Sequence, residues 1–457
     1  MVQIDEKIGN LSKKKLELIF DSGTFVELSA YTKRESSNED FESVVCGYGA
    51  VCGKLAFAFV QDSGRTKGAF SERHSRKIAE MYSLAIKNGA PVIGVFDSAG
   101  AVIYDGSSAL SAYGRFMKCV SDASGIIPQI AVVDGICGGT SAVIASMFDI
   151  TVTIKDISKL YVNPPFVVGK EVGGAEFAAA RGLSAYNAQS EAEAFSFARE
   201  LVSMLPSNNA ESAFVESNDD INREVAIDGL CGKALVEAVA DGGRFVTLYG
   251  EYAENVVLGF ASFGGIVSGV VASSDKNGGA LDISAARAIS KFVSFCDSFS
   301  LPVLTLVDSE GLDVSMKAED AAYASELARL AYAYTSSESA KLTVVTGKAY
   351  GASFALLGSK AIGADMVYAL PNACISVLSP EASVAFVWND GVREKTREEL
   401  EKEWKEKCAS AEEACNKGDV DDIIEPTQLR QRICASFSML SSKADGIPSR
   451  RHANMPL

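Results

Sequence analysis

The feature that most constrains this chain is an internal duplication covering much of its 457 residues. The segment PVIGVFDSAG (91–100) returns 211 residues later as PVLTLVDSEG (302–311). A second segment, VVDGICGGTS (132–141), returns 212 residues later as VVTGKAYGAS (344–353). Three more pairs match at the first offset: Gly53 and Gly264, Gly68 and Gly279, and Ala69 and Ala280. A repeat of this length predicts two copies of one fold.

Each copy shows the same succession of strands and helices. An apolar strand region is followed by a loop, a helix with one apolar stripe, a short strand headed by proline, a second helix, and a strand that runs through glycine into another helix. The strand ranges are 44–61, 91–97 and 128–133 in the first copy, and 256–273, 302–308 and 341–346 in the second. The apolar stripes are Ile78, Met81, Tyr82 and Ala85 in the first copy, and Ile289, Phe292, Val293 and Cys296 in the second. This alternation predicts an α/β fold with buried sheets.

The duplication also predicts the domain organisation. We expect an N-terminal domain over residues 1–215 and a C-terminal domain over 216–457, joined by the polar segment 205–225. The charged stretch 391–418 favours an exposed helix near the C-terminal end.

Composition excludes several classes of function. A net charge of −16 argues against sequence-independent nucleic-acid binding, which needs lysine and arginine. The two histidines, His74 and His452, leave little for a histidine-dependent hydrolase or a histidine-rich metal site. Ten scattered cysteines favour free thiols in a reducing compartment. No apolar run has the length of a membrane span and residues 1–15 lack a signal-peptide core, so we expect a cytoplasmic protein. The shortage of histidine and the absence of a dense His/Cys cluster predict a protein without a metal.

The two strand–glycine–helix junctions are the best candidate sites. The first amides of a helix have no internal partner, and glycine lets a ligand approach the backbone closely. Two such N–H groups can stabilise an enolate or a ureido oxyanion without any particular side chain. The predicted catalytic residues are Gly138, Gly139, Thr140, Gly351, Ala352 and Ser353.

Other readings of these features remain open. The junction glycines could serve only tight strand–helix packing, although neither junction matches a P-loop or a nucleophile elbow. A basic cluster could meet phosphates or simply form a solvated helix face; it comprises Arg65, Lys67, Arg73, Arg76 and Lys77. Asp97 and Asp308 follow strands, where aspartate is usually a helix cap. Packing is the expected role of Cys137 and of both histidines.

Motifs along nearly the whole chain resemble those of the biotin-dependent carboxyltransferases, the family of propionyl-CoA and acetyl-CoA carboxylase beta subunits and methylmalonyl-CoA and glutaconyl-CoA decarboxylase alpha subunits. The motifs, in family order, are KKKLELIFDSGTFVEL (13–28), SERHSRKI (71–78), PVIGVFDSAG (91–100), LPSNN (205–209), GGALDISAARAISKFVSFCDSFSLPVLTLVD (278–308), LTVVTGKAYGASF (342–354), VDDIIEPTQLRQRIC (420–434) and RHANMPL (451–457).

This resemblance implies two tandem crotonase-like domains, assembled as a dimer of trimers with each active site between domains of different subunits. It implies that Gly139–Thr140 holds the thioester oxygen of an acyl-CoA and Ala352–Ser353 the ureido oxygen of biotin. The remaining residues expected to bind the two cofactors are Gly100, Ala101, Lys67, Gly68, Ala69, Gly311 and Tyr350.

The implied reaction moves a carboxyl group between biotin and the α-carbon of a short acyl-CoA, with propionyl-CoA and methylmalonyl-CoA favoured. No Met-Lys-Met biotinylation site is present, so biotin would arrive on a separate carrier protein. The further partner implied by the resemblance is a biotin carboxylase or a membrane decarboxylase subunit. Val102 and the segments 162–171 and 312–327 depart from the family pattern. A specialised or non-catalytic scaffold subunit, a sodium-pumping decarboxylase component, and a hydratase or isomerase of the crotonase group are the alternatives.

Overall fold

The computed structural model describes residues 9–33, 41–388 and 395–443, and it divides the chain into two compact units, Met1–Ser212 and Ala213–Leu457. The predicted linker 205–225 spans this division but is not loose. In unit 1 Asn209 N–H donates to Ile126 O (3.0 Å), and in unit 2 Val215 N–H donates to Gly265 O (2.9 Å). The polar composition of this segment predicts a linker. Composition does not reveal these hydrogen bonds, because they join backbone atoms and do not depend on the side chains.

In the described part of unit 1, eight strands form one sheet in the order β1-β2-β3-β4-β5-β6-β8, with β7 pairing to β5. The β2–β3 hairpin is antiparallel, and β3, β4, β5, β6 and β8 are parallel. The strands are β1 Val26–Leu28, β2 Val44–Val51, β3 Lys54–Gln61, β4 Val92–Ser98, β5 Gln129–Gly138, β6 Ile150–Ile154, β7 Lys159–Tyr161 and β8 Tyr186–Ala188. The α-helices are α1 Asn10–Ile19, α2 Glu72–Asn88, α3 Ser107–Ala123, α4 Thr140–Met147, α5 Pro165–Val168, α6 Ala175–Ala179 and α7 Glu191–Met204.

Unit 2 repeats this topology within its described residues, in the order β16-β14-β13-β12-β11-β10-β9, with β15 pairing to β13. The strands are β9 Phe245–Leu248, β10 Val256–Phe263, β11 Ile266–Ser273, β12 Val303–Ser309, β13 Lys341–Tyr350, β14 Met366–Ala369, β15 Cys374–Ser376 and β16 Asp422–Ile423. The α-helices are α8 Gly232–Val239, α9 Ile283–Ser298, α10 Met316–Asp320, α11 Tyr323–Ser336, α12 Ala352–Leu356, α13 Pro380–Val387, α14 Arg397–Cys408, α15 Ala411–Asn416 and α16 Leu429–Leu440.

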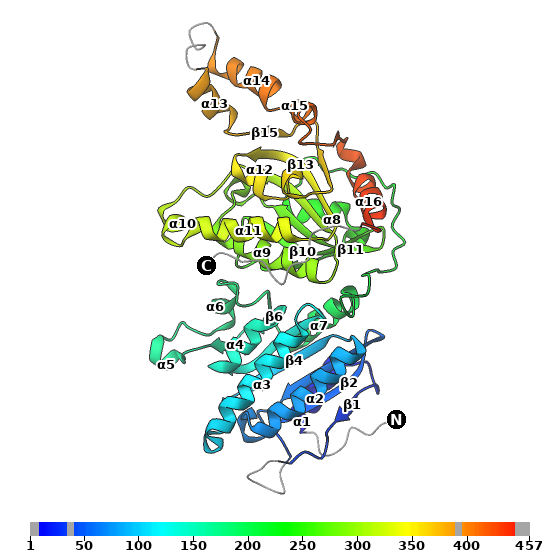
Figure 1. Cartoon of the computed structure of the whole chain (residues 1–457), viewed down its shortest axis with the longest axis vertical. Coiled ribbons are helices and arrows are strands. Elements are labelled where there is room, and N and C mark those ends of the chain that lie inside the picture. Colours follow the sequence, from blue (N-terminus) through cyan, green and yellow to red (C-terminus); the bar gives the residue numbers. More distant parts are fainter. Residues whose placement is uncertain (1–8, 34–40, 389–394, 444–457) are drawn as a thin grey trace. The chain divides into compact units, whose positions relative to one another are not determined.

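Corresponding elements begin and end for the same local reasons. Ser71 and Asp282 cap α2 and α9, accepting from His74 N–H and Ala285 N–H respectively. The predicted apolar stripes of both helices are buried. Figure 1 shows α2 beside α3 in unit 1 and α9 beside α11 in unit 2, so each helix pair covers one face of its own sheet. The predicted strand–helix succession is confirmed in both copies.

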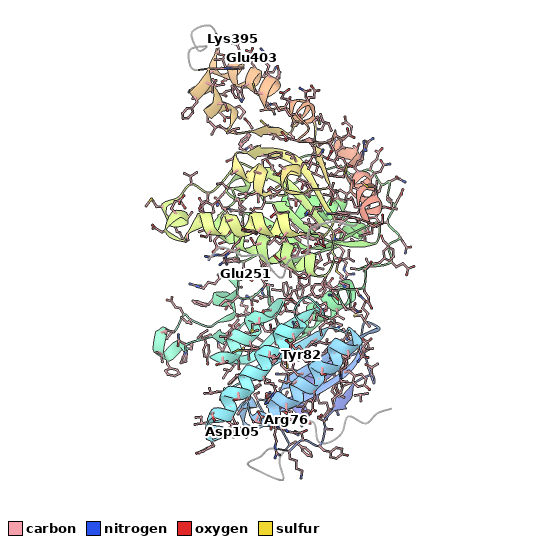
Figure 2. All side chains as sticks on the ribbon, in the orientation of Figure 1. Arg76, Tyr82, Asp105, Glu251, Lys395 and Glu403 are labelled. Carbon is pink, nitrogen blue, oxygen red and sulfur yellow. The ribbon has the colours of Figure 1, made fainter. Side chains whose placement is uncertain are left out.

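The charged stretch 391–418 contains α14 and α15, while residues 391–394 lie outside the described residues. Thr396 and Glu399 form a capping box at the start of α14. Lys395 Nζ lies 2.5 Å from Glu403 Oε2, and both side chains are labelled in Figure 2. The expectation of an exposed helix is therefore correct for residues 397–408, where Leu400 is the buried residue.

Candidate functional site

In unit 1 the predicted junction is a sharp turn between β5 and α4. Gly139 has φ 60° and ψ −127°, a backbone conformation open almost only to glycine. Its N–H donates to Tyr161 O on β7 (2.9 Å). Thr140 is the first residue of α4, and among the described residues its N–H finds no acceptor. The free donor of this turn is therefore Thr140, and Gly139 shapes the turn.

The junction in unit 2 has the same geometry. Gly351 has φ 60° and ψ −144°, and its N–H donates to Ser376 O on β15 (2.9 Å). Ala352 is the first residue of α12, and its N–H is unused within the described chain. Because α12 has only five residues, the helix dipole contributes little here, so the site rests on the amide itself.

These turns correct part of the sequence prediction. Gly139 and Gly351 were expected to offer amides to a ligand, but both amides are already hydrogen-bonded within their own units. Gly138 serves packing, because a Cβ there would lie 2.8 Å from the Tyr161 ring. Ser353 uses its hydroxyl to donate to Tyr350 O (2.8 Å).

A second free amide lies in the loop after β4. Ala99 N–H donates to Lys67 O (2.9 Å), and Val102 N–H donates to Phe70 O (3.0 Å), so the loop is held against the segment before α2. Phe70 N–H in turn donates to Gly100 O (2.8 Å). Between these bonds, Ala101 N–H has no acceptor among the residues that the structure describes. The free donor of this loop is therefore the N–H of Ala101, one of the residues predicted to bind a cofactor.

The loop after β12 is built identically. Glu310 N–H donates to Gly278 O (3.0 Å), Leu281 N–H to Gly311 O (2.9 Å) and Asp313 N–H to Leu281 O (3.0 Å). Leu312 N–H is left without an acceptor in the described part of unit 2. The sequence prediction missed Leu312. Leu312 lies 211 residues after Ala101, which is the offset of the internal duplication, and this correspondence could have identified it.

Each unit therefore carries two free amides at the carboxyl ends of neighbouring parallel strands. Ser98 on β4 pairs with Cys137 on β5, which brings the two loops of unit 1 to the same sheet edge. Ser309 and Ala349 do the same for β12 and β13 in unit 2. Two backbone donors at one edge can hold a developing oxyanion, the arrangement expected of an oxyanion hole.

A cavity of about 670 Å³ adjoins the turn of unit 2. Its lining includes Gly351 and Ala352 from the turn, Val377 and Leu378 after β15, and Trp404 from α14. The free amide of this half thus opens beside a largely apolar cavity. Such a cavity can take a ligand that presents one polar oxygen and a hydrophobic body.

The other predicted binding residues shape the loops. Lys67 is exposed, with φ 56° in the turn before α2. A Cβ on Gly68 would lie 2.2 Å from Asp97 O, so this close approach requires glycine. Ala69 O accepts from Ser43 Oγ (2.9 Å). The pKa of Tyr350 is raised by burial and by a hydrogen bond with Cys374.

Two buried titratable groups of unit 1, His74 and Cys137, are not free acids or bases. Burial, reinforced by the nearby Lys77 charge, lowers the pKa of His74 to about 3, so the imidazole is neutral. Burial raises the pKa of the Cys137 thiol, which keeps it protonated. Over the described ranges, no group of three or more His, Cys, Asp or Glu side chains is placed to hold a metal ion. His452 lies outside the described residues.

The basic cluster is not a single surface. Lys77 is buried and pairs with Glu27 (2.9 Å), while Arg76 pairs with Glu72 (3.1 Å). A uniformly solvated helix face is therefore wrong for Lys77, because a helix periodicity of 3.6 turns this residue toward the interior. The expected capping role of Asp97 and Asp308 is also wrong, since Gly106 and Ser315 occupy the N-cap positions of the next helices.

The duplicated sheet with its amide pairs is the architecture of a crotonase-like enzyme, and the predicted fold class is confirmed. The chain matches the Carboxyl transferase domain family over residues 9–455. It is 32% identical to the methylmalonyl-CoA decarboxylase subunit alpha of Veillonella parvula, with 98% of this chain and 93% of that protein covered. It is also 32% identical to the propionyl-CoA carboxylase carboxyltransferase subunit of Haloferax mediterranei, with the same coverage.

A solved structure of transcarboxylase 12S, described as a hexamer assembly with methylmalonyl-CoA and methylmalonic acid bound, superposes with a TM-score of 0.91. The two share 30% sequence identity over 97% of this chain and 92% of that one. The chain belongs to the carboxyl transferase family, that of the biotin-dependent acyl-CoA carboxyltransferases. Within residues 9–33, 41–388 and 395–443, no helix is both long and apolar enough to cross a bilayer.

Proposed function

We propose that this chain transfers a carboxyl group between biotin on a separate carrier protein and the α-carbon of a short acyl-CoA, with propionyl-CoA and methylmalonyl-CoA as the substrate pair. The observation that carries the proposal is the pair of free backbone amides in each half: Ala101 and Thr140 in unit 1, Leu312 and Ala352 in unit 2. A reaction in which two partners each develop a negative oxygen needs two such sites.

In unit 1 the amides of Ala101 and Thr140 would receive the thioester oxygen of the acyl-CoA. That oxygen gains charge when the α-carbon loses a proton or a carboxylate and becomes an enolate. Hydrogen bonds from fixed amides stabilise this charge more than they stabilise the neutral thioester, which is the condition for lowering the barrier. The proposed donors are backbone amides, so their identity as donors does not depend on the side chain at Val102.

In unit 2 the amides of Leu312 and Ala352 would receive the ureido oxygen of biotin. The cavity beside Ala352, with Trp404 and Val377 in its lining, offers an apolar surface for the fused rings. When bound, carboxylated biotin would supply the carboxyl group and, through its ureido group, the base for the α-proton of the acyl-CoA. The residues of this chain would hold the ureido oxygen at the Leu312 and Ala352 amides and the thioester oxygen at the Ala101 and Thr140 amides, and no protein base would be needed.

The partner subunits would set the direction of the reaction. The similar proteins include both carboxylase and methylmalonyl-CoA decarboxylase subunits, and the latter favour a decarboxylase component as the second candidate function. A homo-hexamer is the assembly we infer, with a biotin carrier protein as the further partner. Large exposed apolar residues in both units, such as Phe166 and Phe386, support an assembly that covers them.

The test is a transcarboxylation assay with free biotin and methylmalonyl-CoA, in which propionyl-CoA is measured. Thr140→Pro and Ala352→Pro remove one amide hydrogen each at the first position of a helix, where proline is tolerated. The preceding glycines have ψ of −127° and −144°, outside the α region that a following proline disfavours. Each variant should lower kcat on the order of 100-fold, the usual effect of deleting one oxyanion donor.

Thr140→Ala and Ala352→Gly are the matched controls, because they change the side chain and keep the amide. They should retain kcat within about three-fold of the parent, since only the backbone donor contributes. Parent enzyme that releases no CO2 from methylmalonyl-, malonyl- or glutaconyl-CoA would favour the scaffold alternative. Equal activity of the proline variants and their controls would remove the two amides from the mechanism.

A further inference from the structure

The strand that leads to each turn is interrupted by a bulge of the same size. In unit 1, Phe96 pairs with Val133 and Ser98 pairs with Cys137. The single residue Asp97 of β4 therefore faces three residues of β5. A bulge of this kind leaves amides of the longer strand without ladder partners and changes the direction of that strand.

Unit 2 repeats the interruption at the corresponding place. Val307 pairs with Val345 and Ser309 pairs with Ala349, so the single residue Asp308 of β12 faces three residues of β13. The two bulges have the same length, lie between the same pair of strands, and end just before the two turns. Tight strand–helix packing alone does not explain why both halves retain this irregularity.

The aspartate carboxylate closes the bulge in both units. Asp97 Oδ1 accepts from Ile136 N–H (3.2 Å), and Asp308 Oδ1 accepts from Lys348 N–H (2.7 Å). Each of these amides belongs to the unpaired part of the bulge. The side chain thus takes the place of the missing ladder bond.

Each carboxylate packs closely against a glycine of the bulge. A Cβ on Gly135 would lie 2.0 Å from Asp97 Oδ1, and a Cβ on Gly347 would lie 2.4 Å from Asp308 Oδ1. The carboxylates therefore rest directly on the bulge backbone, and the repeated glycines make room for them. A longer or displaced side chain would not fit this contact.

The same dipeptide also shapes the opposite loop of each site. Ser98 Oγ accepts from Gly100 N–H (3.2 Å), and Ser309 Oγ accepts from Gly311 N–H (3.3 Å). In each copy the aspartate contacts the next strand, which leads to the free amide of Thr140 or Ala352. The serine contacts the loop after its own strand, which carries the free amide of Ala101 or Leu312.

We propose that Asp97 and Asp308 are positioning residues, each holding the bulge that sets the direction of its oxyanion turn. This inference rests on the proposed function and deepens it. Neither carboxylate needs to touch a substrate, because each acts through the four-residue path from the bulge amide to the free amide of Thr140 or Ala352. Removal of a carboxylate displaces a donor, and the effect should be confined to the half in which the aspartate lies.

The two halves differ in one respect that guides the choice of variants. Asp97 Oδ2 also lies 3.6 Å from Lys15 Nζ, which is buried and pairs with Asp134 (3.0 Å). Asp308 forms no ion pair within the described residues. Substitution of Asp308 therefore removes the bulge hydrogen bond without breaking a close ion pair, whereas substitution of Asp97 also removes one partner of a buried cation.

The experiment uses the intact enzyme and two partial reactions. In the first, methylmalonyl-CoA without biotin loses CO2, its C–C electron pair becomes the enolate, and water supplies the proton that gives propionyl-CoA. In the second, free carboxybiotin without acyl-CoA loses CO2 and takes a proton from water. Asp97→Ala should lower kcat of the first reaction on the order of ten- to 100-fold with KM unchanged, and Asp308→Ala should do the same to the second.

Each alanine variant is the control for the other, because each should leave the partial reaction of the opposite half within about two-fold of the parent. Asp97→Asn and Asp308→Asn retain an oxygen acceptor for the bulge amide and should restore most of the rate. Tyr82→Phe removes a buried hydrogen bond to Gln129, at the far end of β5 (3.0 Å), and should not change kcat. Tyr82 is labelled on α2 in Figure 2.

Amide exchange separates failure of this inference from failure of the proposed function. Loss of the carboxylate should accelerate hydrogen exchange at Ile136 in Asp97→Ala and at Lys348 in Asp308→Ala, measured by mass spectrometry of peptides. If the parent shows no transcarboxylation, the proposed function fails. In that case, or if the parent catalyses neither partial reaction, exchange alone judges the bulge contact. Unchanged exchange overturns the inference, and so does an alanine variant that slows both partial reactions equally.

Discussion

Replacement of Arg430 by methionine should destabilise unit 2 by about 4 kcal/mol, close to the middle of the range for breaking a buried ion pair. The Arg430 side chain is 0% exposed and donates to Asp241 Oδ1 (2.7 Å), Val239 O (2.7 Å) and Asp220 O (3.0 Å). Methionine fills part of the volume but leaves two carbonyl oxygens and a carboxylate without this donor. Unsatisfied buried acceptors cost roughly 1–3 kcal/mol each.

Asp241 makes the loss of unfolding free energy in Arg430→Met depend on pH. Burial alone would raise the pKa of Asp241, but hydrogen bonds from Gly265 N–H, Arg430 and Gly264 N–H lower it overall. A depressed carboxyl pKa contributes stability above the unfolded pKa of about 3.9, and this contribution is lost as pH falls through the folded pKa. Without Arg430 the depression weakens, so the difference between parent and variant should shrink as pH falls below about 4.

Urea unfolding followed by far-UV circular dichroism at pH 7 and at lower pH measures both effects. Arg432→Met is the matched control, because this neighbouring guanidinium is half-exposed, donates to Asp422 Oδ2 (2.8 Å) and otherwise lies over the Tyr368 ring (5.9 Å to the centroid). It should cost less than about 1 kcal/mol, as exposed ion pairs do. A loss below about 1 kcal/mol for Arg430→Met would refute the reasoning from buried acceptors.

Three further predictions concern the two turns, a buried carboxyl group and a surface helix. Gly139→Ala and Gly351→Ala should each lower the free energy of unfolding by about 1–3 kcal/mol, because alanine is strained at φ 60°; thermal unfolding checks this. Burial raises the pKa of Asp134 to about 6 against the attraction of Lys15, so the parent should lose stability relative to Asp134→Asn as pH rises from about 4 to about 6, measured by urea unfolding. Thr396→Ala removes a capping box and should destabilise α14 by about 1 kcal/mol, seen as faster amide exchange in that helix alone.

Local patterns were enough to predict the repeated strands, the helices and the two junctions. Apolar periodicity located the buried face of α2, and the strand–glycine–helix pattern located the turns at Gly139 and Gly351. These features depend on residues close together in sequence, which is why sequence reasoning reached them.

The details that were missed depend on contacts between distant segments. The amide of Gly139 is occupied because β7 lies beside β5, and nothing within the turn reveals that pairing. The sequence predicts a helix-capping role for Asp97, because aspartate after a strand is usually a cap. In the structure its carboxylate instead accepts from Ile136 N–H, in the bulge of the neighbouring strand. Leu312 escaped notice because an amide donor carries no side-chain signature.

Both tryptophans of the chain lie in unit 2, where Trp388 and Trp404 meet edge to face with ring centroids 4.9 Å apart. Trp404 lines the cavity beside Ala352, and unit 1 contributes only tyrosine and phenylalanine as aromatic fluorophores. Excitation at the red edge of tryptophan absorption therefore gives an intrinsic optical signal from one half of a duplicated protein. When a ligand is titrated into the unlabelled enzyme, tryptophan fluorescence would report binding in the unit 2 cavity. Unit 1 contains no tryptophan and would not contribute to this signal.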